Sequence, residues 1–254
     1  MALPAEHGGW SFVAEPAILG LALAPSAAGA CLALAALVGF LARHPLKLLL
    51  MDRRRGARYP RTALAEGVFA GYTGLASLLV ALAFVLAPAP FWLPLLAATP
   101  IGLVAVAFDA LGRSREALPE AAGAVALGAS ATAIALAGGA PAGAAWGAWA
   151  LLALRAATSV PYVRARLRLD RGREVGAPAV HVGHAAALAA ATGLAAAGFA
   201  PWLAPAVFLV LLARSGWGLS PGRGAIRPQA LGVQEVGYGV LTLVLLAVGY
   251  RVGF

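Results

Sequence analysis

The sequence predicts an all-α, polytopic transmembrane helix bundle of about nine spans, and its composition and length carry this prediction. Of the 254 residues, 61% are hydrophobic and 11% are charged, whereas a soluble domain carries roughly 25% charged residues. A spanning helix needs roughly 20 mainly apolar residues, so a chain of this length holds several spans joined by short connections. We therefore expect residues 1–254 to form a single transmembrane domain.

Apolar runs alternate with segments of Pro, Gly and charged residues, which mark the connections. No Lys or Arg precedes the first run, so we expect it to be a retained span rather than a secretory signal. The expected spans are residues 10–25, 28–46, 67–87, 91–108, 120–138, 143–161, 178–198, 202–217 and 231–250.

The connections between these runs are alternately uncharged and basic. The uncharged ones are typical of tight extracytoplasmic turns, and the positive-inside rule places the basic ones in the cytoplasm. This pattern predicts a multi-pass protein of a bacterial inner membrane, with a cytoplasmic N-terminus and an extracytoplasmic C-terminus. The same rule explains the net charge of +9, so we expect membrane lipids as partners and no nucleic acid.

Polar residues at membrane depth are costly and usually face a cavity or a partner, so they mark the candidate site. The first group surrounds a Gly pair near the N-terminus and comprises Glu6, His7, Trp10 and Glu15. An amphipathic or re-entrant segment would place Trp10 at the membrane interface and Glu15 inside the bundle. A plain interfacial anchor is the alternative.

A second group lies at the inner end of the second expected span. Arg43 and Lys47 are four residues apart and share a helix face, with His44 beside them. Ordinary positive-inside anchoring is the alternative interpretation.

A third group follows the sixth expected span. Beside Arg164, the residues Arg166, Asp170 and Glu174 recur at intervals of four, so a continuing helix would present one cation and two carboxylates on one face. The alternative is again anchoring at the cytoplasmic surface.

Two histidines, His181 and His184, lie three residues apart near the start of the seventh expected span. Such a pair occurs in metal and haem sites, but two ligands do not make a site. No Cys or carboxylate cluster accompanies them, so packing or hydrogen bonding is favoured and no metal ligand is assigned. Arg155 and Glu235 also lie within expected spans, and the sequence does not identify their partners.

The N-terminal and second polar groups carry a family resemblance. The stretch Glu6 to Trp10 reads EHGGW, is followed by Glu15-Pro16, and precedes the stretch Arg43 to Lys47, which reads RHPLK. Together they resemble the YwiC-like family of bacterial membrane proteins, along the length of the chain. That family brings no established activity with it.

The nine-span layout, with polar connections after spans two, four and six, also resembles the UbiA superfamily of intramembrane prenyltransferases. That resemblance implies two Asp-rich motifs that bind Mg²⁺ and a prenyl diphosphate. Residues 166–178 are similar to the second motif, with Asp170 at its last Asp. Arg113 and Arg115 fall where the middle loop of such enzymes is basic.

The chain departs from that pattern at the metal ligands. His44, Lys47 and Met51 stand at the acidic positions of the first motif, and Arg166 replaces the leading Asp of the second. Because Mg²⁺ prefers oxygen ligands, these changes remove its ligands and predict direct binding of an anion. The cofactor is therefore left open, with Mg²⁺ implied by the resemblance alone.

These observations combine into one hypothesis. Cations of the second and sixth helices hold a phosphate or carboxylate in a cytoplasm-facing cavity with apolar walls, and Glu15, His7 or Asp170 acts as acid or base. The expected substrate-binding residues are Glu6, Trp10, Arg43, His44, Lys47, Arg113, Arg115, Arg164, Arg166, Glu174 and His181.

Three functions remain open from the sequence. The UbiA resemblance implies alkyl or prenyl transfer involving a lipid-soluble molecule. The first alternative is a lipid- or anion-binding membrane protein that holds an isoprenoid or quinone-like ligand without chemistry. The second is a transporter, which is disfavoured because the sequence does not show two related halves with discontinuous spans.

Overall fold

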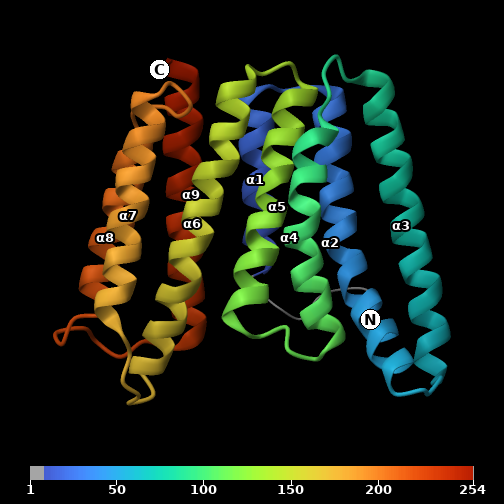
Figure 1. Ribbon diagram of the computed structural model, residues 1–254, viewed down its shortest axis with the longest axis horizontal. Coiled ribbons are helices and arrows are strands. Elements are labelled where there is room, and N and C mark those ends of the chain that lie inside the picture. The colour runs from blue at the N-terminus through green and yellow to red at the C-terminus, as the bar shows by residue number, and fades with distance from the viewer. Residues whose placement is uncertain (1–8, 254) are drawn as a thin grey trace. The chain divides into compact units, whose positions relative to one another are not determined.

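The computed structural model describes residues 9–253, and this range is helical with short connections. In chain order, its elements are α1 (Gly9–Leu23), α2 (Ala27–Arg54), α3 (Pro60–Leu86), α4 (Trp92–Ala110), α5 (Ala117–Ala137), α6 (Ala142–Leu169), α7 (Ala177–Ala196), α8 (Ala204–Gly218) and α9 (Pro228–Val252). The nine helices of this range lie where the apolar runs predicted spans, which confirms the all-α class (Figure 1).

The apolar helices make the chain an integral membrane protein with several spans. Among the described helices, α2, α3, α4, α5, α7 and α9 are long and apolar enough to cross a membrane. The helices α1 and α8 are apolar but contain 15 residues each, and α6 is long but carries four Arg along its 28 residues. The chain divides into two compact units, unit 1 (Met1–Pro141) and unit 2 (Ala142–Phe254).

Unit 1 is built around α2, which packs against α1, α3, α4 and α5 (Figure 1). The helix α5 also packs against α1 and α4, whereas α3 packs mainly along α2. The outer side of α3 therefore exposes large apolar residues such as Leu78, Leu82 and Val85. A side of this kind suits contact with lipid chains, as expected for a membrane-spanning helix.

A glycine sets the close approach of α1 to α5. A Cβ placed on Gly20 would lie 2.7 Å from both the Ala131 carbonyl oxygen and the Ile134 Cβ. Both neighbours belong to α5 and are fully buried. Because small residues let helix backbones approach closely in a membrane, Gly20 allows α1 and α5 to pack without a gap.

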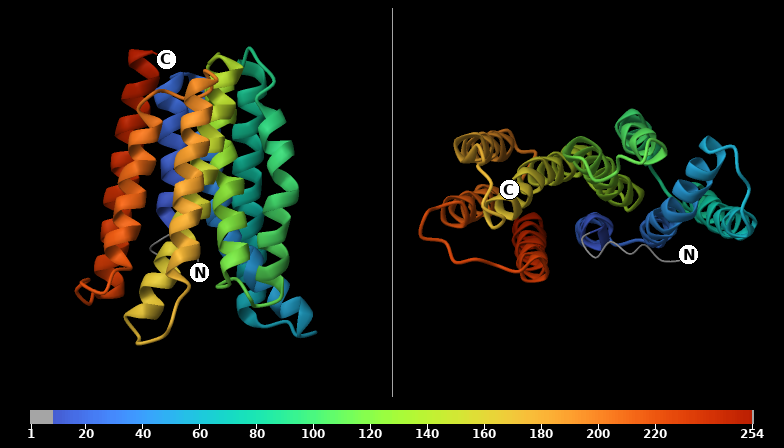
Figure 2. Two further views of the ribbon diagram at one scale, coloured as in Figure 1. Left: turned by 60° about the vertical axis from the view of Figure 1, so that its left-hand side comes forward. Right: turned by 90° about the horizontal axis from the view of Figure 1, so that it is seen from below.

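Unit 2 contains α6 to α9, with α7 packed between α6 and α8, and α9 packed against α8 and α6 (Figure 2). A small hydrophobic core of this unit is formed by Tyr162, Ala165, Leu219 and Leu231. Tyr162 and Ala165 lie in the last turns of α6, Leu231 lies in the first turn of α9, and Leu219 directly follows α8. This core therefore joins the elements near the connections that follow α6 and α8.

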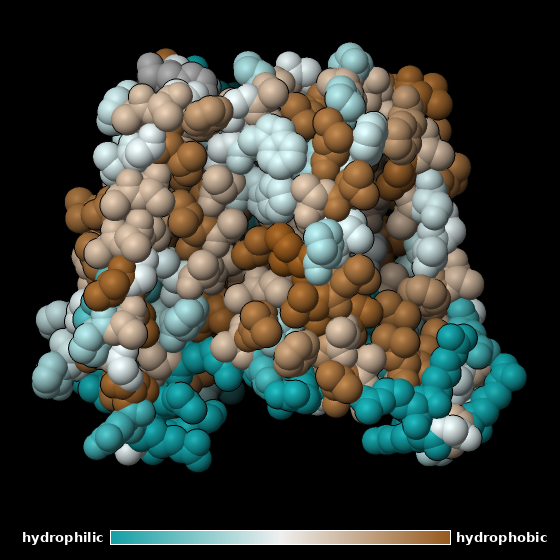
Figure 3. All heavy atoms as spheres, viewed as in Figure 1, coloured by the Kyte–Doolittle hydropathy of each residue, from teal (hydrophilic) through white to brown (hydrophobic). Residues whose placement is uncertain are grey.

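The charged connections gather at one end of each unit. In unit 1 the α2–α3 and α4–α5 connections lie at the same end, and in unit 2 the α6–α7 and α8–α9 connections do so (Figure 1). Hydrophilic residues cover these ends, while the sides of the helices are largely apolar (Figure 3). Within each unit this is the alternation of basic and uncharged connections that the sequence predicts.

Gly20→Ala should destabilise unit 1, because the added methyl group overlaps buried atoms of α5 that cannot move freely. We expect the free energy of unfolding to fall by about 1–3 kcal/mol, as measured by denaturant unfolding in mixed micelles. Gly71→Ala on α3 is the matched control, since its Cβ meets no atom within 4 Å. That control should be neutral or slightly stabilising, and equal losses for both variants would contradict the α1–α5 packing.

Candidate functional site

The cation predicted on α2 pairs with a carboxylate of α4. Arg43 donates from Nε to Asp109 Oδ2 over 2.7 Å and from its NH2 group to Oδ1 over 3.1 Å. The Asp109 side chain is 3% exposed, while that of Arg43 is 37% exposed. This two-pronged geometry is the strongest form of an Arg–carboxylate contact. It places one partly accessible guanidinium at the basic end of α2.

The next turn of α2 contacts the α4–α5 connection. Lys47 Nζ donates to Ser114 Oγ over 2.6 Å, and Arg54 donates to the Ala110 carbonyl oxygen over 2.7 Å. An ammonium group has three N–H donors, so Ser114 occupies one donor of Lys47. These contacts hold the basic end of α2 against the end of α4.

A buried carboxylate joins α2 to α3. Asp52 is fully buried, and it accepts hydrogen bonds from Arg61 over 2.7 Å and from the Thr62 hydroxyl over 2.8 Å. Arg61 also lies over the Tyr59 ring at 4.8 Å. These hydrogen bonds hold the turn between α2 and α3 in place. The role of the Asp52 carboxylate is therefore structural.

Two neighbouring cavities lie beside α2. The first, of about 450 Å³, is bounded by α2, α3, α4 and α5, and its walls include Ala36, Arg43, Leu95 and Ser130. We call it the α2–α5 cavity. Among its described lining residues, Arg43 is the one with an ionisable side chain. The cavity therefore has apolar walls along most of its length and a cation at one end.

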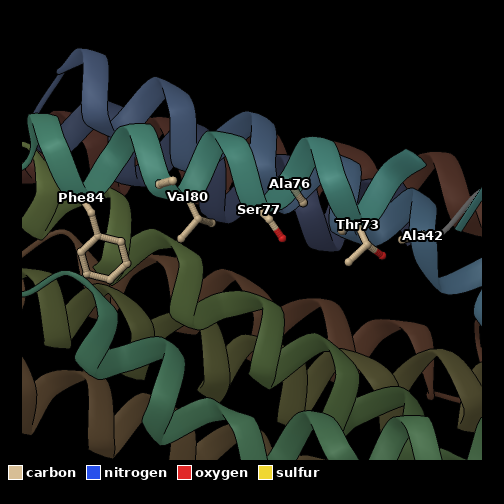
Figure 4. Close-up of a pocket in the computed structure, with 8 residues that line it drawn as sticks. Ala42, Thr73, Ala76, Ser77, Val80 and Phe84 are labelled. Carbon is tan, nitrogen blue, oxygen red and sulfur yellow. The ribbon is translucent and has the colours of Figure 1, made fainter. Parts of the chain in front are cut away.

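The second cavity, of about 470 Å³, lies between α2 and α3. It shares Gly39 and Ala42 of α2 with the first cavity, so the two lie side by side along that helix. Figure 4 shows Thr73, Val80 and Phe84 along one side of α3, facing this space. Two hydroxyl-bearing residues of α3 give this space a weakly polar wall.

The N-terminal group is only partly described. Trp10 lies at the start of α1, where its ring meets the Phe40 ring at 5.6 Å in an edge-on contact. Glu15 is buried on α1 at 5% exposure, as expected for a residue inside the bundle. It does not line the α2–α5 cavity. Glu6 and His7 lie outside the described residues.

The remaining predicted residues of unit 1 lie near its basic end. His44 is half-buried on α2, one residue from Arg43. Arg113 and Arg115 are exposed in the α4–α5 connection. Arg113 donates to Glu116, and this hydrogen bond raises the pKa of the Arg113 guanidinium. The structure thus gathers Arg43, Lys47 and the α4–α5 connection at one end of unit 1.

In unit 2, α6 ends at Leu169, before Asp170 and Glu174. These two residues therefore do not continue the helix that carries Arg166. The amide of Gly172, whose φ is +70°, donates to the Leu169 carbonyl oxygen and closes α6. A left-handed glycine of this kind is a common helix end. Arg166 still lies 3.4 Å from Asp170, but Glu174 lies exposed in the connection. The three-residue face expected from the spacing is therefore not formed.

The two histidines of α7 make separate contacts. His181 Nδ1 is 3.2 Å from Ser215 Oγ, and buried His184 contacts the Val180 carbonyl oxygen through Nδ1 and Arg214 through Nε2. These contacts agree with the hydrogen-bonding role that the sequence favoured. Arg164 is half-buried on α6, two residues before Arg166.

The sequence did not identify two carboxylate partners that organise the site. Arg214 of α8 pairs with Glu235 of α9 over 2.6 Å, and Asp109 pairs with Arg43. Each is a lone charge at the edge of an apolar run, which is the available sequence signal. The spacing of residues along one helix does not reveal a partner on another helix.

The buried carboxylates at the basic end of unit 1 pair with cations rather than with one another. In the described part of the chain, no three His, Cys, Asp or Glu residues gather around a common point.

The sequence profile of the YwiC-like protein family matches residues 3–135. This match covers more than half of the chain, so the protein belongs to the YwiC-like family. The matched range lies within unit 1 and contains every residue that lines the α2–α5 cavity.

No curated protein and no solved structure matches the chain. The likeness to the UbiA superfamily therefore stays a prediction from the sequence.

Arg43→Gln should lower the free energy of unfolding by about 2 kcal/mol, because it leaves a buried carboxylate without its cation. The loss is smaller than for a fully buried pair, since the Arg43 side chain is 37% exposed. The double variant Arg43→Gln/Asp109→Asn replaces the ion pair with two neutral amides and should recover most of the loss. Denaturant unfolding in mixed micelles measures all three variants. Additive losses would show that the two side chains do not interact.

Proposed function

We propose that the protein binds an amphipathic, lipid-soluble molecule with an anionic head group in the α2–α5 cavity, reached from the cytoplasmic side of the membrane. The observation that carries this proposal is an apolar cavity within the membrane-spanning helices that has Arg43 at its basic end.

The cavity suits an apolar chain. On α2 its lining extends from Ala36 to Leu46, which corresponds to about 15 Å along the helix axis. That length is about half of the roughly 30 Å hydrocarbon core of a bilayer. Binding pockets for organic molecules typically have apolar walls and a few polar groups that fix orientation. An isoprenoid or quinone-like chain matches these dimensions.

The basic end suits an anionic group. Arg43 and Lys47 lie on one side of α2, while Asp109 provides one compensating charge. The neighbouring connections add further Arg residues, which raise the local positive potential. A phosphate or carboxylate at this end would accept charge-assisted hydrogen bonds while its chain stays between the helices.

Alkyl or prenyl transfer is the second candidate function. The observation that favours it is the buried Asp109 carboxylate, which pairs with Arg43 at the basic end of the cavity. Glu15 and Asp170 do not line this cavity, so their proposed acid–base role remains a prediction. Release of pyrophosphate from a prenyl diphosphate would distinguish group transfer from binding.

Gly39→Leu should fill the cavities and remove the ligand without unfolding the protein. A Cβ on Gly39 meets no atom within 4 Å, and Gly39 lines both spaces beside α2. We expect the Kd for a fluorescent long-chain fatty acid to rise at least tenfold, or about 1.4 kcal/mol.

Gly71→Leu on α3 is the matched control, because it adds the same side chain to a spanning helix at an open position that lines neither cavity. It should bind the probe like the wild type. Mass spectrometry of lipids that co-purify with each variant provides a second readout. Unchanged binding by Gly39→Leu would exclude the α2–α5 cavity as the site.

The orientation of the site is tested by labelling single cysteines from either side of the membrane. In a Cys31→Ala background, Arg54→Cys in unit 1 and Arg171→Cys in unit 2 both replace exposed residues. An impermeant maleimide should reach both only from the cytoplasmic side, because basic connections are retained there. Labelling from opposite sides would contradict the proposed topology.

A further inference from the structure

A separate cavity in unit 2 is lined by cations. Its volume is about 570 Å³, and its walls come from α6, α8, α9 and the α8–α9 connection. They include Arg166, Arg214, Arg223, Tyr162, Trp217 and Tyr238. No described carboxylate appears among its lining residues. The chemistry of this wall thus differs from that of the α2–α5 cavity, which is mainly apolar.

Arg214 supplies a deeply buried charge of this cavity. It is 6% exposed, pairs with Glu235 over 2.6 Å, and lies over the Tyr162 ring at 4.1 Å and the Tyr238 ring at 5.2 Å. Stacking on aromatic rings holds a guanidinium in place without neutralising it. The position of Arg214 is therefore fixed before any ligand arrives.

The other two guanidiniums share one carboxylate. Arg166 is 5% exposed and donates to the carbonyl oxygens of Gly218 and Gly224. It lies 3.4 Å from Asp170, and Arg223 approaches the same carboxylate at 3.9 Å. Three cations thus face two carboxylates, Asp170 and Glu235, and a net positive charge remains beside the cavity.

Two guanidinium N–H groups in this wall make no hydrogen bond to the described residues. Within the described chain, the Nε atoms of Arg214 and Arg223 are buried and make no hydrogen bond. An unsatisfied buried donor is costly, and a charged one is more so. An oxyanion in the cavity would accept these hydrogen bonds and offset the excess charge. If the three arginines served only to hold the α8–α9 connection, the two Nε atoms would stay without hydrogen bonds. The excess positive charge would also remain without a counter-charge.

We propose that this cavity binds a molecule that carries a phosphate monoester. The planar donor sets of arginine match phosphate oxygens in geometry and charge. The volume exceeds that of a bare phosphate ion and fits a small organic phosphate. Trp217 lines the cavity and is 74% exposed, and Trp residues are enriched at the level of the lipid head groups. The phosphate belongs either to a soluble metabolite or to a lipid.

The test uses the full-length protein and two probes that separate these sources. Glycerol 3-phosphate is added to protein in uncharged detergent, and phosphatidic acid is compared with phosphatidylcholine in nanodiscs. Binding is measured by the rise in thermal unfolding temperature and by calorimetry. Stabilisation by glycerol 3-phosphate identifies a soluble ligand, and stabilisation by phosphatidic acid alone identifies a lipid. No response to either probe overturns the proposal.

Arg223→Gln is the decisive variant, because Arg223 lies in a connection rather than inside a helix. We expect it to weaken binding of the responding probe at least tenfold, with Arg223→Lys intermediate because it retains the charge without the planar donors. Arg173→Gln is the matched control, since it removes an exposed Arg from the basic end of the same unit. Equal weakening by the control would show a surface-charge effect and overturn the site.

The proposal stands apart from the function assigned to unit 1. Gly39→Leu alters the two cavities of unit 1 and no lining residue of the unit 2 cavity, so it should leave phosphate binding unchanged while it removes the fatty-acid probe. Conversely, Arg223→Gln should leave the fatty-acid probe bound. A loss of phosphate binding in Gly39→Leu would assign the phosphate to the unit 1 site and overturn the unit 2 proposal.

Discussion

Pairing of charges between helices is the interaction on which the rest of the structure depends. An ionised side chain within a bilayer is stable only if another charge or a set of dipoles replaces water around it. Here Arg43 meets Asp109 between α2 and α4, and Arg214 meets Glu235 between α8 and α9. Each pair therefore specifies which helices are neighbours, at a point where apolar contacts alone would allow several arrangements.

The pairs also explain where space remains between the helices. Arg43 and Asp109 hold the basic ends of α2 and α4 together through long side chains. Farther from the basic ends, the residues of α2 and α4 that line the cavity are small, as with Gly39, Ala98 and Gly102. Small residues permit close helix packing only where the backbones approach, as at Gly20. Where a polar contact sets the separation, the same residues leave a cavity.

The fold was predictable from the sequence because hydropathy and loop charge act over short segments. Each apolar run became a helix, although α2 and α6 continue past their expected ends at residues 46 and 161 to Arg54 and Leu169. Arg and Leu favour helix, so the helices continue into the basic segments. The helix α6 ends at Leu169 because Gly172 adopts a left-handed backbone conformation. It therefore does not continue to Glu174.

The site was less predictable, because its contacts join residues that are distant in the chain. The i, i+4 spacing correctly placed Arg43 and Lys47 on one side of α2 and kept Arg166 near Asp170. It carried no information on Asp109, which is 66 residues from Arg43. Composition showed that apolar helices would pack together, but the cavities depend on which faces meet.

The length of α8 has a consequence for the surrounding membrane. Its 15 residues span about 22 Å, which is shorter than the roughly 30 Å hydrocarbon core of an average bilayer. Exposed Phe199 and Trp202 extend the apolar surface just before the helix, and Trp217 ends it on the other side. A short apolar helix is accommodated by local thinning of the bilayer, by flanking residues that reach the interface or by oligomerisation, so lipids with shorter acyl chains would match this helix best.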